Sequence, residues 1–187
     1  MFRHIIVSLL IFLFAGVDVQ AAQVGKVEMP DTLAVGGESL RLNGAGIRKK
    51  FFIKLYVSGL YLQQKQGDAD AIVKGDQPMA IRMVITSGMI TPKKMEKATR
   101  EGFDQATHGD TAAIQEKIDQ FVSAFKQGIK KGDVFEMAYV PGQGTRVSKN
   151  GKPEWTIPGL DFKQALFGIW LSDRPAQESL KSAMLGN

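Results

Sequence analysis

Hydrophobic and polar positions along the chain alternate in strand-like and helix-like patterns. Residues 26–62 are strand-like, with turn signals at Gly36-Gly37 and around Gly44–Gly46. Met79–Thr86 predicts another strand, because it alternates partly and is rich in branched side chains. The first third of the chain therefore predicts several strands before any helix.

Two helices are expected next. Thr91-Pro92 is a cap residue followed by proline at the first helical position, which predicts a helix to about Ala106. A second helix should start near Asp110 or Thr111 and end between Gly128 and Gly132. Its apolar residues fall on one helical face. They are Ile114, Ile118, Phe121, Val122 and Phe125.

Strand patterns return at Asp133–Val140, and Asn150-Gly151 is a strong hairpin signal between two further strand candidates. Pro158-Gly159 ends this region. The last segment predicts two short helices joined near Asp173–Pro175. Strands, helices, a hairpin and helices again predict one α+β domain, in which a large antiparallel sheet is covered on one face by a layer of helices.

The N-terminus has the pattern of a secretory signal peptide. Arg3 and His4 precede an apolar run over residues 5–17, and small residues stand at Ala21 and Ala22. We therefore expect a signal peptide over residues 1–21, a domain over 22–187, and a periplasmic or secreted protein. An uncleaved anchor is the alternative. The apolar run is shorter than the ~20 residues of a comfortable membrane span. No second long apolar segment follows, so we expect no integral membrane segment after cleavage.

The composition of the chain argues against several kinds of functional site. The 187 residues include no cysteine, and His108 is the only histidine after the expected signal peptide, so we expect no metal and no cofactor. The net charge of +5 is spread along the chain, whereas nucleic-acid binding predicts a concentrated basic stripe. Gly44-Ala45-Gly46 has Lys49 where a dinucleotide loop needs its third glycine. Most carboxylates lie beside lysines on expected helix surfaces, which favours solvated charge over acid–base catalysis.

The strand after Phe51 has two different faces. We expect one face to pack against the helices; it carries Phe51, Ile53, Leu55, Val57, Gly59 and Tyr61. The other face mixes apolar and polar groups; it carries Phe52, Lys54, Tyr56, Ser58, Leu60 and Leu62. Such a mixed face is typical of the lining of an amphiphile pocket, or of a sheet edge with snorkelling side chains. Both interpretations remain open on the residues alone.

Two segments carry a resemblance to a known family. "NGAGIRKKFFIKLYVSGLYL" (43–62) is similar to the entry motif of the chalcone-isomerase fold family. "FKQALFGIWLSDRPAQESLKSAML" (162–185) is similar to the closing region of bacterial chalcone-isomerase-like proteins. The resemblance covers about residues 24–185. It implies an open-faced β-sandwich with a ligand cleft between sheet and helices. The family contains enzymes that close a chalcone to a flavanone and non-catalytic relatives that bind fatty acids.

The resemblance also assigns site residues. The family's active-site arginine falls on Arg48, and the tyrosine that joins it on the carboxylate in the fatty-acid-binding relatives falls on Tyr56. The enzymes' helical tyrosine and asparagine fall on Lys94 and Glu101, and their lysine falls on Ile85. The resemblance therefore implies Arg48 and Tyr56 as ligand-binding residues and no catalytic residue.

Arg48 and Tyr56 are eight residues apart, which is ~26 Å along a continuous strand. Both can contact one carboxylate only if the chain turns between them, within residues 49–52.

Three functional hypotheses follow. The leading one is an exported, non-catalytic protein that binds an amphiphilic carboxylate such as a fatty acid. The first alternative is an intramolecular lyase acting on a phenolic enone, which tyrosine and asparagine side chains near Arg48 would favour. The second alternative is a scaffold or interaction protein with no small ligand, which the lack of a pocket would favour. The sequence names no protein partner.

Overall fold

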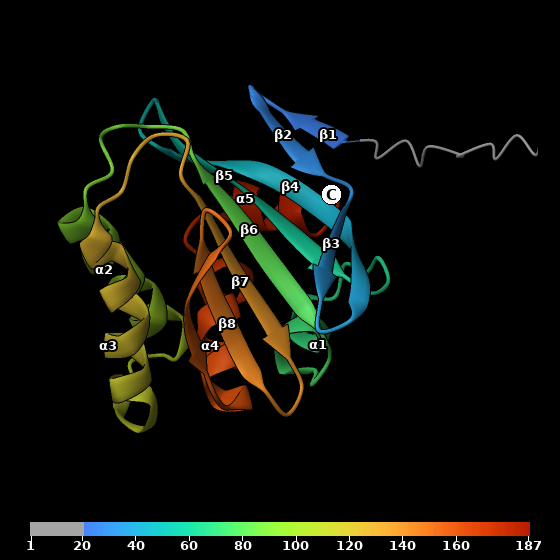
Figure 1. Ribbon diagram of the computed structural model, residues 1–187, viewed down its shortest axis with the longest axis vertical. Coiled ribbons are helices and arrows are strands. Elements are labelled where there is room, and N and C mark those ends of the chain that lie inside the picture. Colours follow the sequence, from blue (N-terminus) through green and yellow to red (C-terminus); the bar gives the residue numbers. More distant parts are fainter. Residues whose placement is uncertain (1–20) are drawn as a thin grey trace, which may run out of the picture.

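The computed structural model describes residues 21–187, in which one curled antiparallel sheet is covered on one face by helices (Figure 1). The expected signal peptide lies, apart from Ala21, outside the described residues. The strands are β1 (Ala21–Val24), β2 (Val27–Pro30), β3 (Thr32–Val35), β4 (Glu38–Lys50), β5 (Ile53–Leu62), β6 (Met79–Ile85), β7 (Val134–Val140), β8 (Gly144–Lys149) and β9 (Lys152–Ile157). The helices are α1 (Ala69–Lys74), α2 (Pro92–Ala106), α3 (Gln115–Ser123), α4 (Leu160–Leu171) and α5 (Glu178–Met184), with 3₁₀ turns η1 (Ala112–Ile114) and η2 (Ala124–Gln127).

The main sheet has seven strands in the order β3-β4-β5-β6-β7-β8-β9, and every neighbouring pair is antiparallel. β1 and β2 form a separate two-stranded sheet. The helices follow as long connections between strands or after the last strand. The predicted α+β class, with a large antiparallel sheet under a helical layer, is therefore confirmed.

Several local predictions are confirmed with their physical reasons. α2 begins at Pro92, and the Thr91 hydroxyl accepts a hydrogen bond from the Lys94 amide, as expected of a helix cap. The β8–β9 turn has Asn150 and Gly151 at φ values of 52° and 77°, the left-handed backbone that this dipeptide favours in tight hairpins. The helix expected from Asp110 is shorter, because a 3₁₀ turn precedes α3. α1, capped by Asp68, was not predicted.

The turn expected around Gly44–Gly46 is wrong, because β4 continues through these residues. The glycines serve another purpose: α5 packs directly on the backbone of β4. A Cβ atom at Gly44 would lie 2.2 Å from the Ala183 carbonyl oxygen, and one at Gly46 would lie 2.8 Å from the Ala183 Cβ. Glycine within a strand commonly marks such a close approach. The real turn follows at Phe51 and Phe52.

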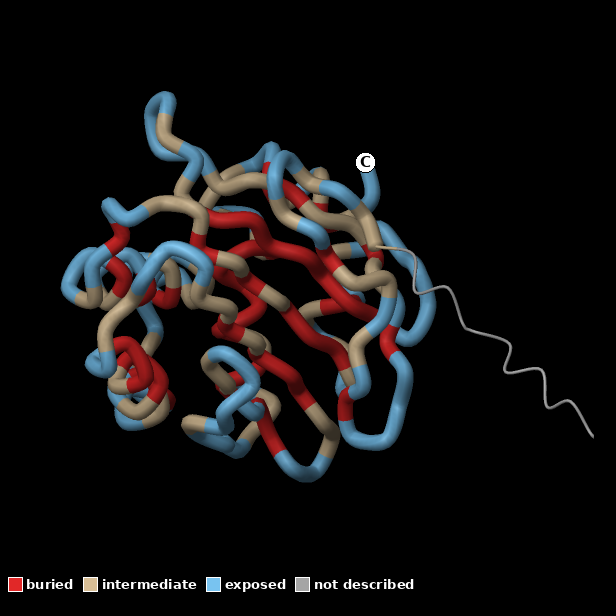
Figure 2. The backbone as a smooth tube through the Cα atoms, turned by 45° about the horizontal axis from the view of Figure 1, so that its top comes forward, coloured by how far each residue is buried: buried red, intermediate tan, exposed pale blue. Residues whose placement is uncertain are grey.

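The two faces of β5 are the reverse of those expected. Tyr56 and Leu60 belong to the core between sheet and helices, whereas Val57 and Tyr61 belong to a second core on the other face. N-terminal residues such as Met29 cover that second face. Because both faces are buried, alternation alone could not tell which one meets the helices. Figure 2 shows buried backbone running through the middle strands.

A fully buried lysine joins two helices behind the sheet. Lys163 on α4 has no exposed surface, and its Nζ donates to the carbonyl oxygens of Ile72, Val73 and Gly75 at 2.7–2.8 Å. These carbonyls lie at the C-terminal end of α1, where a helix leaves its acceptors unpaired. Burial lowers the pKa of Lys163 to about 8, and the nearby Asp76 carboxylate only partly opposes this lowering. Lys163 thus caps α1 and holds it against α4.

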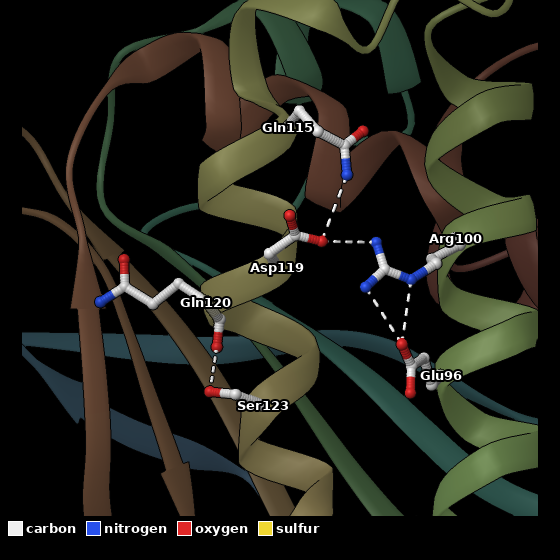
Figure 3. A network of polar contacts seen from close by, with 6 residues as sticks. All are labelled: Glu96, Arg100, Gln115, Asp119, Gln120 and Ser123. Carbon is white, nitrogen blue, oxygen red and sulfur yellow. Dashed lines mark hydrogen bonds and ion pairs between the residues drawn. The ribbon is translucent and has the colours of Figure 1, made fainter.

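Charged residues join α2 to α3 on the surface (Figure 3). Arg100 on α2 contacts Asp119 on α3 at 2.7 Å and Glu96 on its own helix at 3.0 Å. Gln115 donates a further hydrogen bond to Asp119. These carboxylates are partly exposed and ion-paired, as solvated structural charges are. Within residues 21–187, no helix is long and apolar enough to cross a bilayer.

Candidate functional site

The β4–β5 hairpin brings Arg48 and Tyr56 directly opposite each other. The chain reverses at Phe51 and Phe52, and Arg48 and Tyr56 are paired residues in the antiparallel register. Directly opposed residues on neighbouring strands project their side chains to the same side of the sheet. Arg48 and Tyr56 could contact one carboxylate only if the chain turned within residues 49–52, and the structure has this turn. Their binding role remains a prediction.

Tyr56 is a buried neutral phenol with a proton to donate. Its hydroxyl oxygen accepts a hydrogen bond from Trp170 Nε1 at 3.1 Å, and its side chain is almost fully buried. Burial raises the pKa of Tyr56, and the hydrogen bond from Trp170 and the nearby Arg48 guanidinium only partly oppose this. Within residues 21–187 the Tyr56 hydroxyl has no hydrogen-bond acceptor. It is therefore suited to donate to an anion held by Arg48.

The guanidinium of Arg48 has neutral partners only. Its Nη1 donates to the Lys49 carbonyl oxygen and to Gln177 Oε1, the latter at 3.1 Å. Gln177 Oε1 also accepts from the Lys49 amide at 2.8 Å. No carboxylate of the described chain forms an ion pair with Arg48. The Gln177 side-chain oxygen thus occupies a position where an oxygen of a bound carboxylate could contact Arg48.

A third polar group lies on the same face of β5. Ser58 is two residues beyond Tyr56 and fully buried, and its hydroxyl has no hydrogen-bond partner in the described residues. An unpaired buried hydroxyl is unfavourable and calls for a partner, and a polar ligand group could provide one here. The Thr145 hydroxyl on β8 is unpaired in the same way, so the observation does not by itself mark a site. The helix-facing side of this hairpin therefore carries a buried phenol and a buried hydroxyl, with a partly buried guanidinium beside them.

The site is closed in this structure. One hollow of about 440 Å³ lies at the far end of β5, between Gln64, Ile72 and Gln77. Another of about 270 Å³ lies on the opposite face of the sheet, between Ala34 and Arg146. Neither contains Arg48 or Tyr56. By the criterion stated for the sequence, the lack of an open pocket at the Arg48–Tyr56 pair within residues 21–187 favours the scaffold alternative. A ligand at this pair would have to displace the Gln177 side chain and neighbouring core groups.

The three positions where the resemblance expected enzyme residues contain no suitable group. Lys94 and Glu101 are exposed on α2; Lys94 donates to the Met89 carbonyl, and Glu101 faces Lys97. Ile85 is buried and paired with Tyr56 across β5 and β6, so it adds apolar surface beside the phenol.

His108 contacts Asp173 and makes no described contact with the Arg48–Tyr56 pair. It is exposed in the α2–α3 connection, and its Nε2 lies 3.4 Å from an Asp173 oxygen. In residues 21–187 no group of histidine and carboxylate side chains could hold a metal ion.

Gln177 and Trp170 are site residues that sequence reasoning missed. Both lie in the closing segment that carried the resemblance, but no local pattern assigns them a role. Gln177 directly precedes α5, and Trp170 lies near the end of α4, so only the packing of these helices on the β4–β5 hairpin brings them to Arg48 and Tyr56.

Comparisons with known proteins agree with the fold described above. A family model described as chalcone isomerase-like matches residues 21–186. The structure is similar to that of a fatty-acid binding protein of Arabidopsis thaliana, with a TM-score of 0.67 and 19% sequence identity. The match covers 82% of this chain and 90% of the plant chain. No curated protein matches the chain by sequence. The expected open-faced β-sandwich of the chalcone isomerase type is therefore confirmed.

Proposed function

Because this chain belongs to the chalcone isomerase-like family, we propose that it is a non-catalytic protein that binds an amphiphilic carboxylate, such as a fatty acid, between sheet and helices. The observation that carries the proposal is the paired Arg48 and Tyr56 on the helix-facing side of the β4–β5 hairpin. The structural similarity to a plant fatty-acid binding protein supports the same ligand class.

The chemistry of the pair suits a carboxylate. A guanidinium can donate two parallel hydrogen bonds to the two carboxylate oxygens. The Tyr56 phenol can donate a further one, since Trp170 already occupies its oxygen as a donor. In this account the ligand replaces Gln177 Oε1 on Arg48, and its hydrocarbon chain lies among the apolar side chains around Ile85.

The experiment that tests this function is the identification of ligands carried by the protein. Lipids extracted from the purified protein should contain fatty acids, and a delipidated sample should bind added palmitate with a one-to-one stoichiometry. Failure of the delipidated protein to bind any fatty acid across chain lengths would exclude the proposal.

Chalcone cyclisation is expected to be absent or marginal. Lys94, Glu101 and Ile85 stand where the resemblance places the enzymes' tyrosine, asparagine and lysine. Groups that stabilise transition-state charge are each worth ~3 kcal/mol, so the loss of several leaves little rate. The measurement is the cyclisation of a hydroxychalcone with and without protein. A rate well above the spontaneous one that disappears in Arg48→Ala would instead support the lyase.

Export is a further part of the proposal, motivated by the signal-peptide pattern of residues 1–21. Expression of the full chain in a Gram-negative host should give a periplasmic protein whose N-terminus lies near Ala22. N-terminal sequencing of the recovered protein checks this. A cytoplasmic product that retains Met1 would refute export without affecting the binding proposal.

A further inference from the structure

The tip of the β4–β5 hairpin carries two adjacent phenylalanines in water. The exposed fractions of Phe51 and Phe52 are 86% and 102%, the highest among the large apolar side chains that are exposed in the described chain. The tip projects from the end of the sheet in Figure 1 and forms an exposed loop in Figure 2. Neither ring contributes to the two hydrophobic cores. The fold therefore gains little from aromatic side chains here.

The backbone conformation of Phe51 is a second sign that the fold does not require a phenylalanine here. Its φ is 55°, in the left-handed region that glycine and asparagine adopt more readily than phenylalanine does. Two-residue hairpin loops usually place those small residues where φ is positive. A phenylalanine that is exposed and also held in a disfavoured backbone conformation points to a role outside folding.

Positive charge surrounds the two rings. Lys49, Lys50 and Lys54 are exposed on the same hairpin. One loop lies against its base, where the Ser87 amide donates to the Leu55 carbonyl. A second loop lies against the adjacent end of β6, where the Gly132 amide donates to the Ile85 carbonyl. These loops and the residues beside them add exposed Met89, Lys93, Lys94, Lys130 and Lys131.

Carboxylates are missing from all three segments that form this end of the sheet. Residues 39–67, 77–95 and 120–132 contain no aspartate or glutamate. The acidic residues that follow the second and third segments, Glu96 and Asp133, are ion-paired with Arg100 and Lys149. A fourth segment contacts the base of the hairpin through Gln177, and exposed Glu178 follows it. This end of the domain therefore presents an apolar tip within positive charge that one nearby carboxylate only partly offsets.

We propose that this end of the domain docks on an anionic phospholipid membrane. The rings of Phe51 and Phe52 enter the interface, and the surrounding lysines contact lipid phosphates. Exposed aromatic groups beside lysines fit the boundary between headgroups and acyl chains, and anionic lipids attract such cationic surfaces. The proposal does not depend on what Arg48 binds.

The test uses vesicles of phosphatidylcholine with phosphatidylglycerol in a ratio of roughly two to one, compared with phosphatidylcholine alone. Wild type should float with the anionic vesicles and release as salt is raised. Lys49→Gln/Lys50→Gln should bind about thirtyfold more weakly. Phe51→Asn/Phe52→Ser should bind at least about tenfold more weakly. All proteins carry the same N-terminus, so its contribution cancels.

Two matched controls separate the tip from general effects. Arg41→Gln/Lys65→Gln removes two exposed cations at the opposite end of β4 and β5, and Trp155→Ser removes an exposed aromatic ring on distant β9. Both should bind as wild type does. Phe51→Asn should also unfold at no lower temperature than wild type, because asparagine tolerates the left-handed backbone.

A local reporter completes the test. Phe52→Trp should show an emission blue shift when anionic vesicles are added, because the indole enters the interface. The absence of that shift would overturn the proposal. So would tip variants that bind as tightly as wild type, or equal binding to both vesicle types.

Discussion

Replacing Lys163 by methionine is expected to lower the free energy of unfolding by about 3 kcal/mol at neutral pH. Methionine fills a similar volume but leaves the carbonyl oxygens of Ile72, Val73 and Gly75 without their donor. Each unsatisfied buried carbonyl costs about 1–3 kcal/mol, and removing the desolvated ammonium offsets part of that sum. Denaturant unfolding of the two proteins measures the difference.

The matched control is Lys97→Met on α2. Lys97 is largely exposed and makes only a 3.8 Å contact with Glu101, so its loss should change stability by less than about 0.5 kcal/mol. Equal stability of wild type and Lys163→Met would mean that the buried ammonium costs as much as its three hydrogen bonds contribute.

The pH dependence of that difference has a definite sign. The pKa of Lys163 is lowered by burial to about 8 in the fold, against 10.5 for the ordinary side chain. Between these values the unfolded chain binds more protons than the folded chain, so the stability of the folded state rises with pH. Wild type should therefore gain stability relative to Lys163→Met from about pH 8 to about pH 10.5. A difference in the free energy of unfolding that stays constant over this range would contradict the lowered pKa of Lys163.

Replacing Arg48 by alanine is expected to weaken fatty-acid binding by roughly ten- to a hundredfold, since a charge-assisted hydrogen bond contributes ~1.5–3 kcal/mol. Stability should change much less, because Arg48 is only partly buried and its partners are a carbonyl and an amide oxygen. Tyr56→Phe removes only a hydroxyl and should cost ~1 kcal/mol of binding. Titration of palmitate into each delipidated variant gives these values.

The control for Arg48 lies on the same hairpin. Lys54→Ala removes an exposed cation near Arg48 that forms no part of the Arg48–Tyr56 pair, and it should leave palmitate affinity unchanged. A loss as large in Lys54→Ala as in Arg48→Ala would mean that the cationic surface, rather than the Arg48–Tyr56 pair, attracts the ligand.

The sequence could predict those parts of the fold that local patterns determine. α2 has a cap residue and proline at its start, and the β8–β9 turn has Asn150-Gly151, so each was located within a few residues. The face of β5 that meets the helices could not be predicted, because N-terminal residues bury the opposite face. Gly44 and Gly46 suggested a turn, but their reason is the packing of α5, which is far away in the sequence.

The candidate site likewise has residues that the sequence could predict and residues that it could not. The family resemblance implies the Arg48–Tyr56 pair, and strand geometry predicts the turn that brings the two residues together. Gln177 and Trp170 complete the site through contacts more than 100 residues apart in the chain, which no local pattern could provide. Lys163 could have been identified from the sequence, because it is the single lysine among the mostly apolar residues of α4. That helix is buried on nearly all sides.

The most direct test of carboxylate binding is the affinity of wild type for a fatty acid and for the fatty alcohol of the same length. The two ligands bury the same hydrocarbon chain, so their difference isolates the contact of the head group with Arg48 and Tyr56. The account predicts that the acid binds at least about tenfold more tightly than the alcohol, and that Arg48→Ala removes most of this difference. Equal affinities for acid and alcohol in wild type would contradict it, even if both ligands bound.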